Sequence, residues 1–260
     1  MSGAIVRQLT PEEEELSRKR EELTSIRATL AECELELADL RTHLKSFEGR
    51  YLRQVGVLYA ELDDWDAKVA ELEAKLENSS SAHQRAQQAR KRADETHEAT
   101  HGEASKAPDF TPSADLKSLF RKAAMQFHPD FAKNPTDEKR RTKLFMQAKA
   151  AFDRGDVETL QRLLNNDQDS SDNISGEGIG AELIRIIRQI AQVKKNIIFI
   201  EENLAALRIS EIAKLERKVA LAQKQDRDLL AELAANVVEQ IGRARKEYEA
   251  LGEEAKRRGR

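Results

Sequence analysis

Two long segments of the chain place apolar residues three or four positions apart, as helices that pack along one seam do. In the first segment one apolar position recurs every seven residues, and a second lies three residues after it. The first set is Leu9, Leu16, Leu23, Leu30, Leu37, Leu44, Tyr51, Leu58, Trp65 and Leu72, and the second is Ile26, Cys33, Leu40 and Phe47. This heptad pattern predicts a coiled-coil arm over residues 9–77. Thr10 and Pro11 supply the cap and the first-turn proline of its helix.

The heptad pattern of this arm is interrupted once. Phe47, Tyr51 and Val55 are separated by two successive steps of four residues. Such a four-residue stutter locally unwinds a supercoil. Gly49 and Gly56 flank the stutter, and each weakens a helix by about 1 kcal/mol relative to alanine.

A second arm has the same spacing and is predicted over residues 179–256. Its apolar positions run without error from Ile179 to Leu207, and the phase then slips by one residue near position 209. The two arms have similar lengths and one defect each, so we predict that they pair as an antiparallel hairpin, with Leu9 near Leu251 and Leu76 near Ile179. The alternative is that each arm dimerises with its copy in a second chain.

Three pieces connect the arms. Residues 78–107 are polar and compatible with a helix, with alanines at helical spacing, and we predict an exposed or thinly packed helical stalk there. Residues 165–178 are rich in Asn, Asp, Ser and Gly, and they are predicted to form a flexible linker. A distinct segment, residues 108–164, lies between the stalk and the linker.

Composition and charge agree with an all-α protein and narrow its function. Ala, Leu, Glu, Lys and Arg make up about half of the chain, and aromatic residues only 5%, which disfavours a compact enzyme. The net charge of −3 gives no general basicity for nucleic acid, although residues 108–166 hold 11 basic and 8 acidic side chains. Cys33 is the single cysteine, and no run of eighteen apolar residues suggests a membrane span. We therefore expect a soluble cytoplasmic protein without nucleic-acid or membrane partners.

The central segment predicts a short helical hairpin with an aromatic core. Its first helix has an apolar stripe, Pro129 ends that helix, and a second helix is expected from about residue 138 to residue 153. The apolar positions expected to meet between the two helices are Leu116, Phe120, Ala123, Phe127, Phe145, Ala148 and Phe152. This arrangement would display His128, Pro129 and Asp130 at the turn.

Two sequences in this segment, LKSLFRKAAMQFHPD (116–130) and FMQAKAAF (145–152), resemble the J-domain family, the DnaJ-type co-chaperones. The resemblance covers about 50 of the 260 residues. It implies that His128, Pro129 and Asp130 form the loop that stimulates ATP hydrolysis by a DnaK-type chaperone. It also implies that Lys117, Arg121 and Lys122 form the basic face that docks on that partner.

The resemblance further implies a fold in which a J-like domain is inserted at the tip of the coiled-coil hairpin. The family's usual first helix, with its Tyr-x-x-Leu-Gly pattern, has no match in residues 95–112. The short amphipathic segment Val157–Leu164 is the candidate to cover the hydrophobic face that this helix would cover. The expected role is that of a co-chaperone, not an enzyme, which recruits the chaperone to an unidentified client or scaffold bound by the arms.

The sequence also allows other interpretations. The rival function is a coiled-coil scaffold whose tip is a degenerate J-like spacer, and a homo-oligomer through the arms stays open. His97-Glu98-Ala99-Thr100-His101 matches the zinc-peptidase pattern, but its polar surroundings favour coincidence, so no metal site is expected. No Gly-x-x-x-x-Gly-Lys loop is present, and no cofactor is expected.

Overall fold

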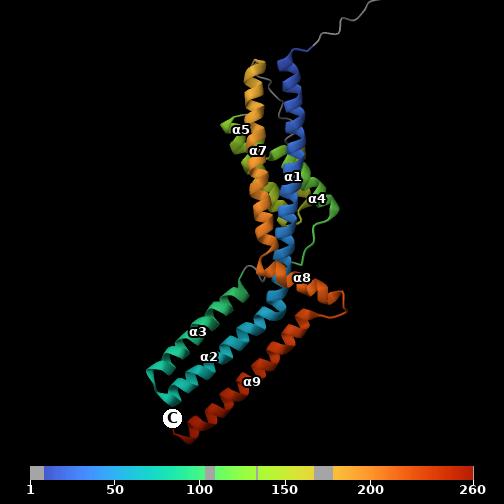
Figure 1. Ribbon diagram of the computed structural model, residues 1–260. Coiled ribbons are helices and arrows are strands. Elements are labelled where there is room, and N and C mark those ends of the chain that lie inside the picture. The colour runs from blue at the N-terminus through green and yellow to red at the C-terminus, as the bar shows by residue number, and fades with distance from the viewer. Residues whose placement is uncertain (1–8, 103–108, 133, 167–177, 260) are drawn as a thin grey trace, which may run out of the picture. The chain divides into compact units, whose positions relative to one another are not determined.

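The computed structural model describes residues 9–102, 109–132, 134–166 and 178–259, and within these ranges every regular element is a helix (Figure 1). The elements are α1 (Pro11–Tyr51), a π-helical turn η1 (Leu52–Gly56), α2 (Val57–Glu77), α3 (Ser80–His101), α4 (Ala114–Phe127), a 3-10 turn η3 (Pro129–Phe131), α5 (Pro135–Asp153), α6 (Val157–Asn166), α7 (Ile179–Arg208), α8 (Glu211–Gln223) and α9 (Leu229–Arg257). The all-α prediction is therefore confirmed for the described part of the chain. Residues 167–177 of the predicted linker lie outside it.

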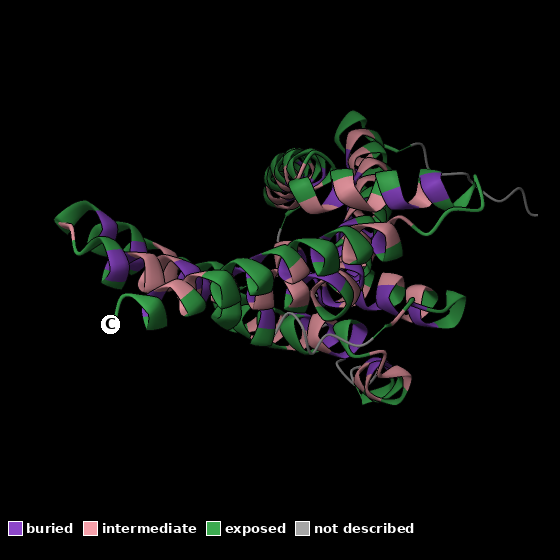
Figure 2. Cartoon of the chain, turned by 90° about the horizontal axis from the view of Figure 1, so that it is seen from below, coloured by how far each residue is buried: buried purple, intermediate pink, exposed green. Residues whose placement is uncertain are grey.

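The chain divides into two compact units. Unit 1 comprises residues 1–42 and 111–208, and unit 2 comprises residues 43–110 and 209–260. Helix α1 contributes its first three-quarters to unit 1 and its end to unit 2. Figure 2 shows that buried and exposed residues alternate along the helices.

In unit 1, α1 and α7 lie side by side and run in the same direction (Figure 1). Their contact forms two successive apolar clusters. Leu16 and Leu23 pack with Ile186 and Ile190, and further along both helices Leu30 and Leu37 pack with Val193, Ile200 and Leu204. The ion pairs between the helices follow the same order, because Arg20 bonds to Glu182 and Arg208 bonds to Glu36.

The predicted antiparallel register is wrong, because the N-terminal part of arm 1 packs on the N-terminal part of arm 2. A heptad seam has the same period in both directions, so matched lengths and defects do not determine the direction of pairing. The described residues between the arms also form the helices α3 to α6 in place of a tight reversal.

Unit 2 has the same parallel pairing between α2 and α9. Leu62 packs with Val237 and Ile241, and further along the pair the Trp65 ring meets the Tyr248 ring edge-on at a centroid distance of 5.8 Å. The seam of arm 1 thus continues in a second core.

Helix α3 packs back along α2 as an antiparallel hairpin through a narrow buried side, and most of its other residues are exposed. Asn78 adopts the left-handed conformation (φ 53°) that ends α2, and the Ser79 hydroxyl accepts a hydrogen bond from the Ala82 amide to begin α3. Alanines at helical spacing allow the close approach, since Ala82 and Ala86 are buried with Ala74 of α2. Arg90 adds bonds to Glu71 at 2.8 Å and to Asp64 at 2.7 Å.

Both predicted defects coincide with breaks in regular helix. The stutter lies at η1, where a π-helical turn occurs between α1 and α2. The phase slip lies where α7 ends at Arg208 and Ser210 caps α8. A further break, at Lys224–Asp228, means that the predicted single arm 179–256 is three helices.

Candidate functional site

The J-like segment, predicted as residues 108–164, is built on an aromatic core between α4 and α5. Phe120 is completely buried, and its ring lies 4.7 Å from the Phe152 ring and 6.2 Å from the Phe145 ring, measured between centroids. The Ser113 hydroxyl accepts a hydrogen bond from the Leu116 amide and so begins α4. All seven residues predicted to meet between the two helices are buried, namely Leu116, Phe120, Ala123, Phe127, Phe145, Ala148 and Phe152.

Helix α6 completes this core. It packs against both α4 and α5, and Leu160 and Leu164 are buried there. Asp156 begins the helix by accepting hydrogen bonds from the amide and the hydroxyl of Thr159, at 2.9 and 2.7 Å. The amphipathic segment thus covers the aromatic core, as predicted.

The loop after α4 consists of His128, Pro129, Asp130 and Phe131, and it is called the HPD loop below. Proline stops the helix because it has no N–H donor and restricts the preceding residue to an extended conformation. His128 accordingly has φ −62° and ψ 130°. Its Nδ1 accepts a hydrogen bond from the Asp130 amide at 3.2 Å, which folds the loop into the 3-10 turn η3.

The imidazole of His128 is turned inward, with only 4% of the residue exposed. Its Nε2 lies 3.5 Å from Oε1 of Glu34 on α1, and Oε2 of the same carboxylate bonds to Lys149 of α5 at 3.0 Å. Burial by itself would raise the pKa of Glu34, but the hydrogen bond from His128 and the Lys149 charge outweigh it and lower that pKa. Glu34 therefore joins α1 to the HPD loop and to α5 as a charged acceptor.

Asp130 is bound by the second long helix of unit 1. The Asn196 amide on α7 donates a hydrogen bond to Oδ2 of Asp130. Burial raises the pKa of Asp130, against the opposing effects of His128 and Asn196. A shallow groove of about 660 Å³ beside Asp130, lined among others by Ile184 and Arg188, leaves part of the loop open to solvent.

Phe131 anchors the HPD loop between α1 and α7. It is buried in the cluster formed by Leu30 and Leu37 of α1 with Val193 and Ile200 of α7. The guanidinium of Arg27 lies over its ring, 4.5 Å from the centroid. The loop therefore shares the apolar core of the two long helices.

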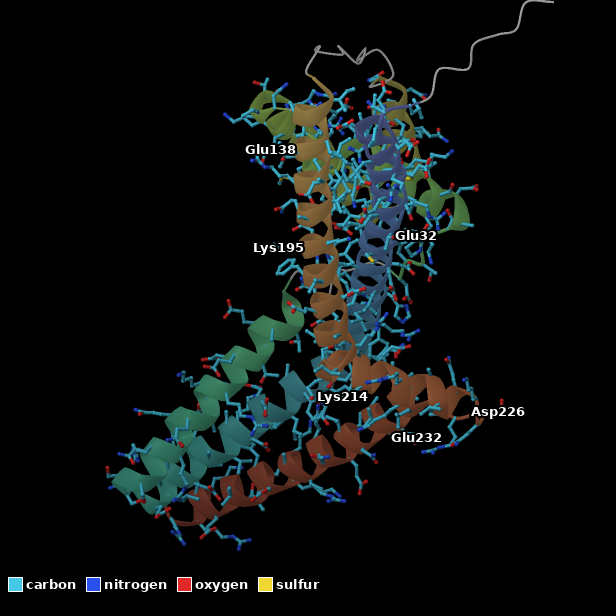
Figure 3. All side chains as sticks on the ribbon, turned by 45° about the horizontal axis from the view of Figure 1, so that its top comes forward. Glu32, Glu138, Lys195, Lys214, Asp226 and Glu232 are labelled. Atoms are coloured by element: carbon cyan, nitrogen blue, oxygen red, sulfur yellow. The ribbon has the colours of Figure 1, made fainter. Side chains whose placement is uncertain are left out.

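The predicted docking face on α4 also meets α1. Lys117 bonds to Asp39 at 2.9 Å, and Arg121 pairs with Glu32. Figure 3 shows Glu32 on the side of α1 next to α4. The third predicted docking residue, Lys122, is exposed.

The structure thus brings together the predicted loop and most of the predicted basic face, but not as predicted. We expected these residues to be displayed at a tip, whereas they lie against the sides of α1 and α7. Periodicity identified α4 and α5 but did not indicate Glu32, Glu34, Asp39 and Asn196 as their neighbours. A charge signal was present, because residues 1–80 hold 18 acidic and 11 basic side chains while the central segment is basic.

The other histidine constellation gives no comparable site. The rings of His97 and His101 on α3 stack at a centroid distance of 4.1 Å, and Nδ1 of His101 lies 3.0 Å from the His97 carbonyl oxygen. Within the described ranges no cluster of three or more His, Cys, Asp or Glu side chains could hold a metal ion. No helix in that part of the chain is long and apolar enough to cross a membrane.

Comparisons with known proteins returned no match to a family model, to a curated protein or to a solved structure. The functional argument therefore depends on the residues of this chain.

Proposed function

We propose that this protein is a co-chaperone whose J-like segment stimulates ATP hydrolysis by a DnaK-type chaperone. The observation that carries the proposal is the pair α4 and α5, joined by the HPD loop and closed over an aromatic core. A proline-restricted loop at the end of a basic amphipathic helix is the arrangement that the family resemblance implies. The long helices would recruit the chaperone to a client or scaffold. We propose that the protein acts in the cytoplasm.

The proposed residues have two roles, electrostatic attraction of the chaperone and specific contact with it. Lys117, Arg121 and Lys122 would attract an acidic surface on the chaperone, because cations on one helix face increase the rate of encounter with an acidic partner. His128, Pro129 and Asp130 would then make the specific contact. The chain would act by shifting the conformation of the chaperone and would not itself make or break covalent bonds.

The test is single-turnover ATP hydrolysis by a purified DnaK-type chaperone, titrated with the full-length chain. We expect stimulation that decreases as salt is added and that is lost in His128→Gln. Since His128 is buried against Glu34, helicity and thermal unfolding of this variant are measured alongside.

A second variant separates docking from folding. Lys122 is exposed on α4, so Lys122→Glu should weaken stimulation without affecting the thermal midpoint. Lys139→Glu, the same charge reversal at an exposed position of α5, is the matched control and should behave as the parent chain. Absence of stimulation at every chain concentration would reject the proposal.

A second candidate is a helical scaffold in which the HPD loop only fastens α4 and α5 to the long helices. It is favoured by the burial of His128 against Glu34 and by the bond from Asn196 to Asp130. Co-precipitation with the chaperone distinguishes the candidates, because chaperone docking should depend on nucleotide and on salt whereas a scaffold contact should not.

The long helices themselves are proposed to bind the client or a second copy of the chain. Along α7 several large apolar residues are exposed, among them Ile184, Ile187, Ile198 and Phe199. The seams of the two arms are already paired within one chain, which supports a monomer that folds alone. Light scattering at decreasing concentrations tests this. The molar mass of an obligate dimer would fall by half upon dilution, and the chain would unfold at the same concentrations.

A further inference from the structure

We infer that α1 and α7 form a built-in inhibitor of the J-like segment, which holds the HPD loop and the basic face closed until the helices release them. This inference rests on the proposed co-chaperone function. It concerns the regulation of the same residues.

Most of the surface assigned to the chaperone is in contact with the long helices. His128 meets Glu34 of α1, and Asp130 accepts a hydrogen bond from Asn196 of α7. On α4, Lys117 pairs with Asp39 and Arg121 with Glu32. While α1 and α7 are in place, the bonding groups of these four residues are already engaged, so a chaperone would have to displace the long helices to bind them in full.

The chemistry of α1 matches what an acidic chaperone surface would offer. Glu32, Glu34 and Asp39 present carboxylates to Arg121, His128 and Lys117 in turn. Glu32 and Asp39 are seven residues apart, so one heptad places both on the same face of α1. Helix α1 would therefore compete with the chaperone for the same cations.

The closed state is expected to be reversible. The Lys117–Asp39 and Arg121–Glu32 pairs are about a third to a half exposed, and such pairs contribute little because water and salt screen them. The firmer attachments are the buried His128–Glu34 contact and Phe131 in the apolar cluster. If only a fraction of molecules is open, the apparent affinity for the chaperone equals the affinity of the open state multiplied by that fraction.

The test uses charge reversals on α1, so that every residue proposed to touch the chaperone stays unchanged. In the double variant Glu32→Lys/Asp39→Lys, the two introduced lysines face Arg121 and Lys117 and should repel α4. The matched control is Glu14→Lys/Glu21→Lys, two exposed positions of the same helix with the same spacing of seven. Thermal unfolding shows that both variants fold, and hydrogen exchange of the Asp130 and Phe131 amides reports whether the loop has opened.

We expect the opened variant to reach half-maximal stimulation of the chaperone ATPase at about a tenth of the parent concentration, which corresponds to about 1.4 kcal/mol. The control should match the parent, and only the opened variant should show faster exchange in the loop.

Three results would overturn the inference, and they separate it from the proposed function. If exchange in the loop is unchanged, these charges do not hold the loop closed. If the loop opens but all three proteins stimulate equally, the closed state does not inhibit, and the proposed function stands. If the loop opens and none of the proteins stimulates, the proposed function fails and this inference fails with it.

Discussion

Nε2 of His128 lies 3.5 Å from Oε1 of Glu34, so the loop between α4 and α5 is joined to α1 by a buried contact. Glu34 also binds Lys149 at 3.0 Å. Removing a buried charged acceptor leaves its donors unsatisfied, so Glu34→Ala should lower the free energy of unfolding by about 1–3 kcal/mol. Urea unfolding at pH 7 measures this, with the exposed Glu21→Ala as the control, which should stay within about 0.5 kcal/mol of the parent.

The same carboxylate should make part of the stability depend on pH. The pKa of Glu34 in the folded chain lies below its ordinary value of 4.5, so its contribution is fully present above pH 4.5 and is lost as the pH falls through the folded pKa. We expect the stability difference between the parent and Glu34→Gln to be constant from pH 7 to about pH 5 and to shrink in more acidic solution. The pKa of Asp130 is raised, so the contribution of Asp130 to stability changes with pH in the opposite direction. Asp130 is present in both proteins, so its contribution cancels in the difference between them. A difference that grows with acid would contradict the assigned role of Glu34.

The aromatic core of the J-like segment should dominate the stability of unit 1. Phe120 is completely buried and contacts the rings of Phe145 and Phe152. Phe120→Ala should cost about 3–5 kcal/mol, because it removes apolar burial and leaves a cavity. Met146→Ala on the adjacent helix is the control, since Met146 is 66% exposed, and it should change stability by less than about 0.5 kcal/mol. Equal effects of the two substitutions would be inconsistent with this core.

The glycine that ends the π-helical turn of unit 2 is closely surrounded by side chains. A Cβ at Gly56 would lie 3.0 Å from Cδ2 of Leu52 and 3.2 Å from Cγ2 of Thr100, so Gly56→Ala should destabilise the chain by about 1–2 kcal/mol. Gly242 is also helical but has no neighbour within 4 Å of such a Cβ, and Gly242→Ala should stabilise by about 0.5–1 kcal/mol. Thermal unfolding of both variants checks the opposite signs. A stabilising Gly56→Ala would show that the turn tolerates a side chain.

The parallel direction of α1 and α7 can be tested by cross-linking in a Cys33→Ser background. Leu23 and Ile190 share one apolar cluster, so cysteines at these two positions should form a disulfide upon mild oxidation. Leu204 lies 14 residues further along α7, about 21 Å away, and a pair at positions 23 and 204 should stay reduced. A disulfide between positions 23 and 204, with none between positions 23 and 190, would contradict this register.

The sequence alone determined most of the helical segments and the side chains of the aromatic core. Heptad spacing identified α1 and α7, and the stripe from Leu116 to Phe127 identified α4, because a helix brings residues three and four apart onto one face. Both irregularities in the spacing marked breaks in regular helix, at Leu52–Gly56 and after Arg208. Each of these features depends on residues that are close in the chain.

Only the tertiary structure decided the direction of the α1–α7 pair and the surroundings of the HPD loop. A heptad repeat reads the same toward either end, so its period does not distinguish parallel from antiparallel pairing. Glu34 and Asn196 are polar residues beside their seams, and local spacing does not indicate that they bond to His128 and Asp130. These contacts join residues far apart in the chain, and they depend on how the packed helices bring them together. The sequence alone therefore led us to expect an exposed loop where the fold places a covered one.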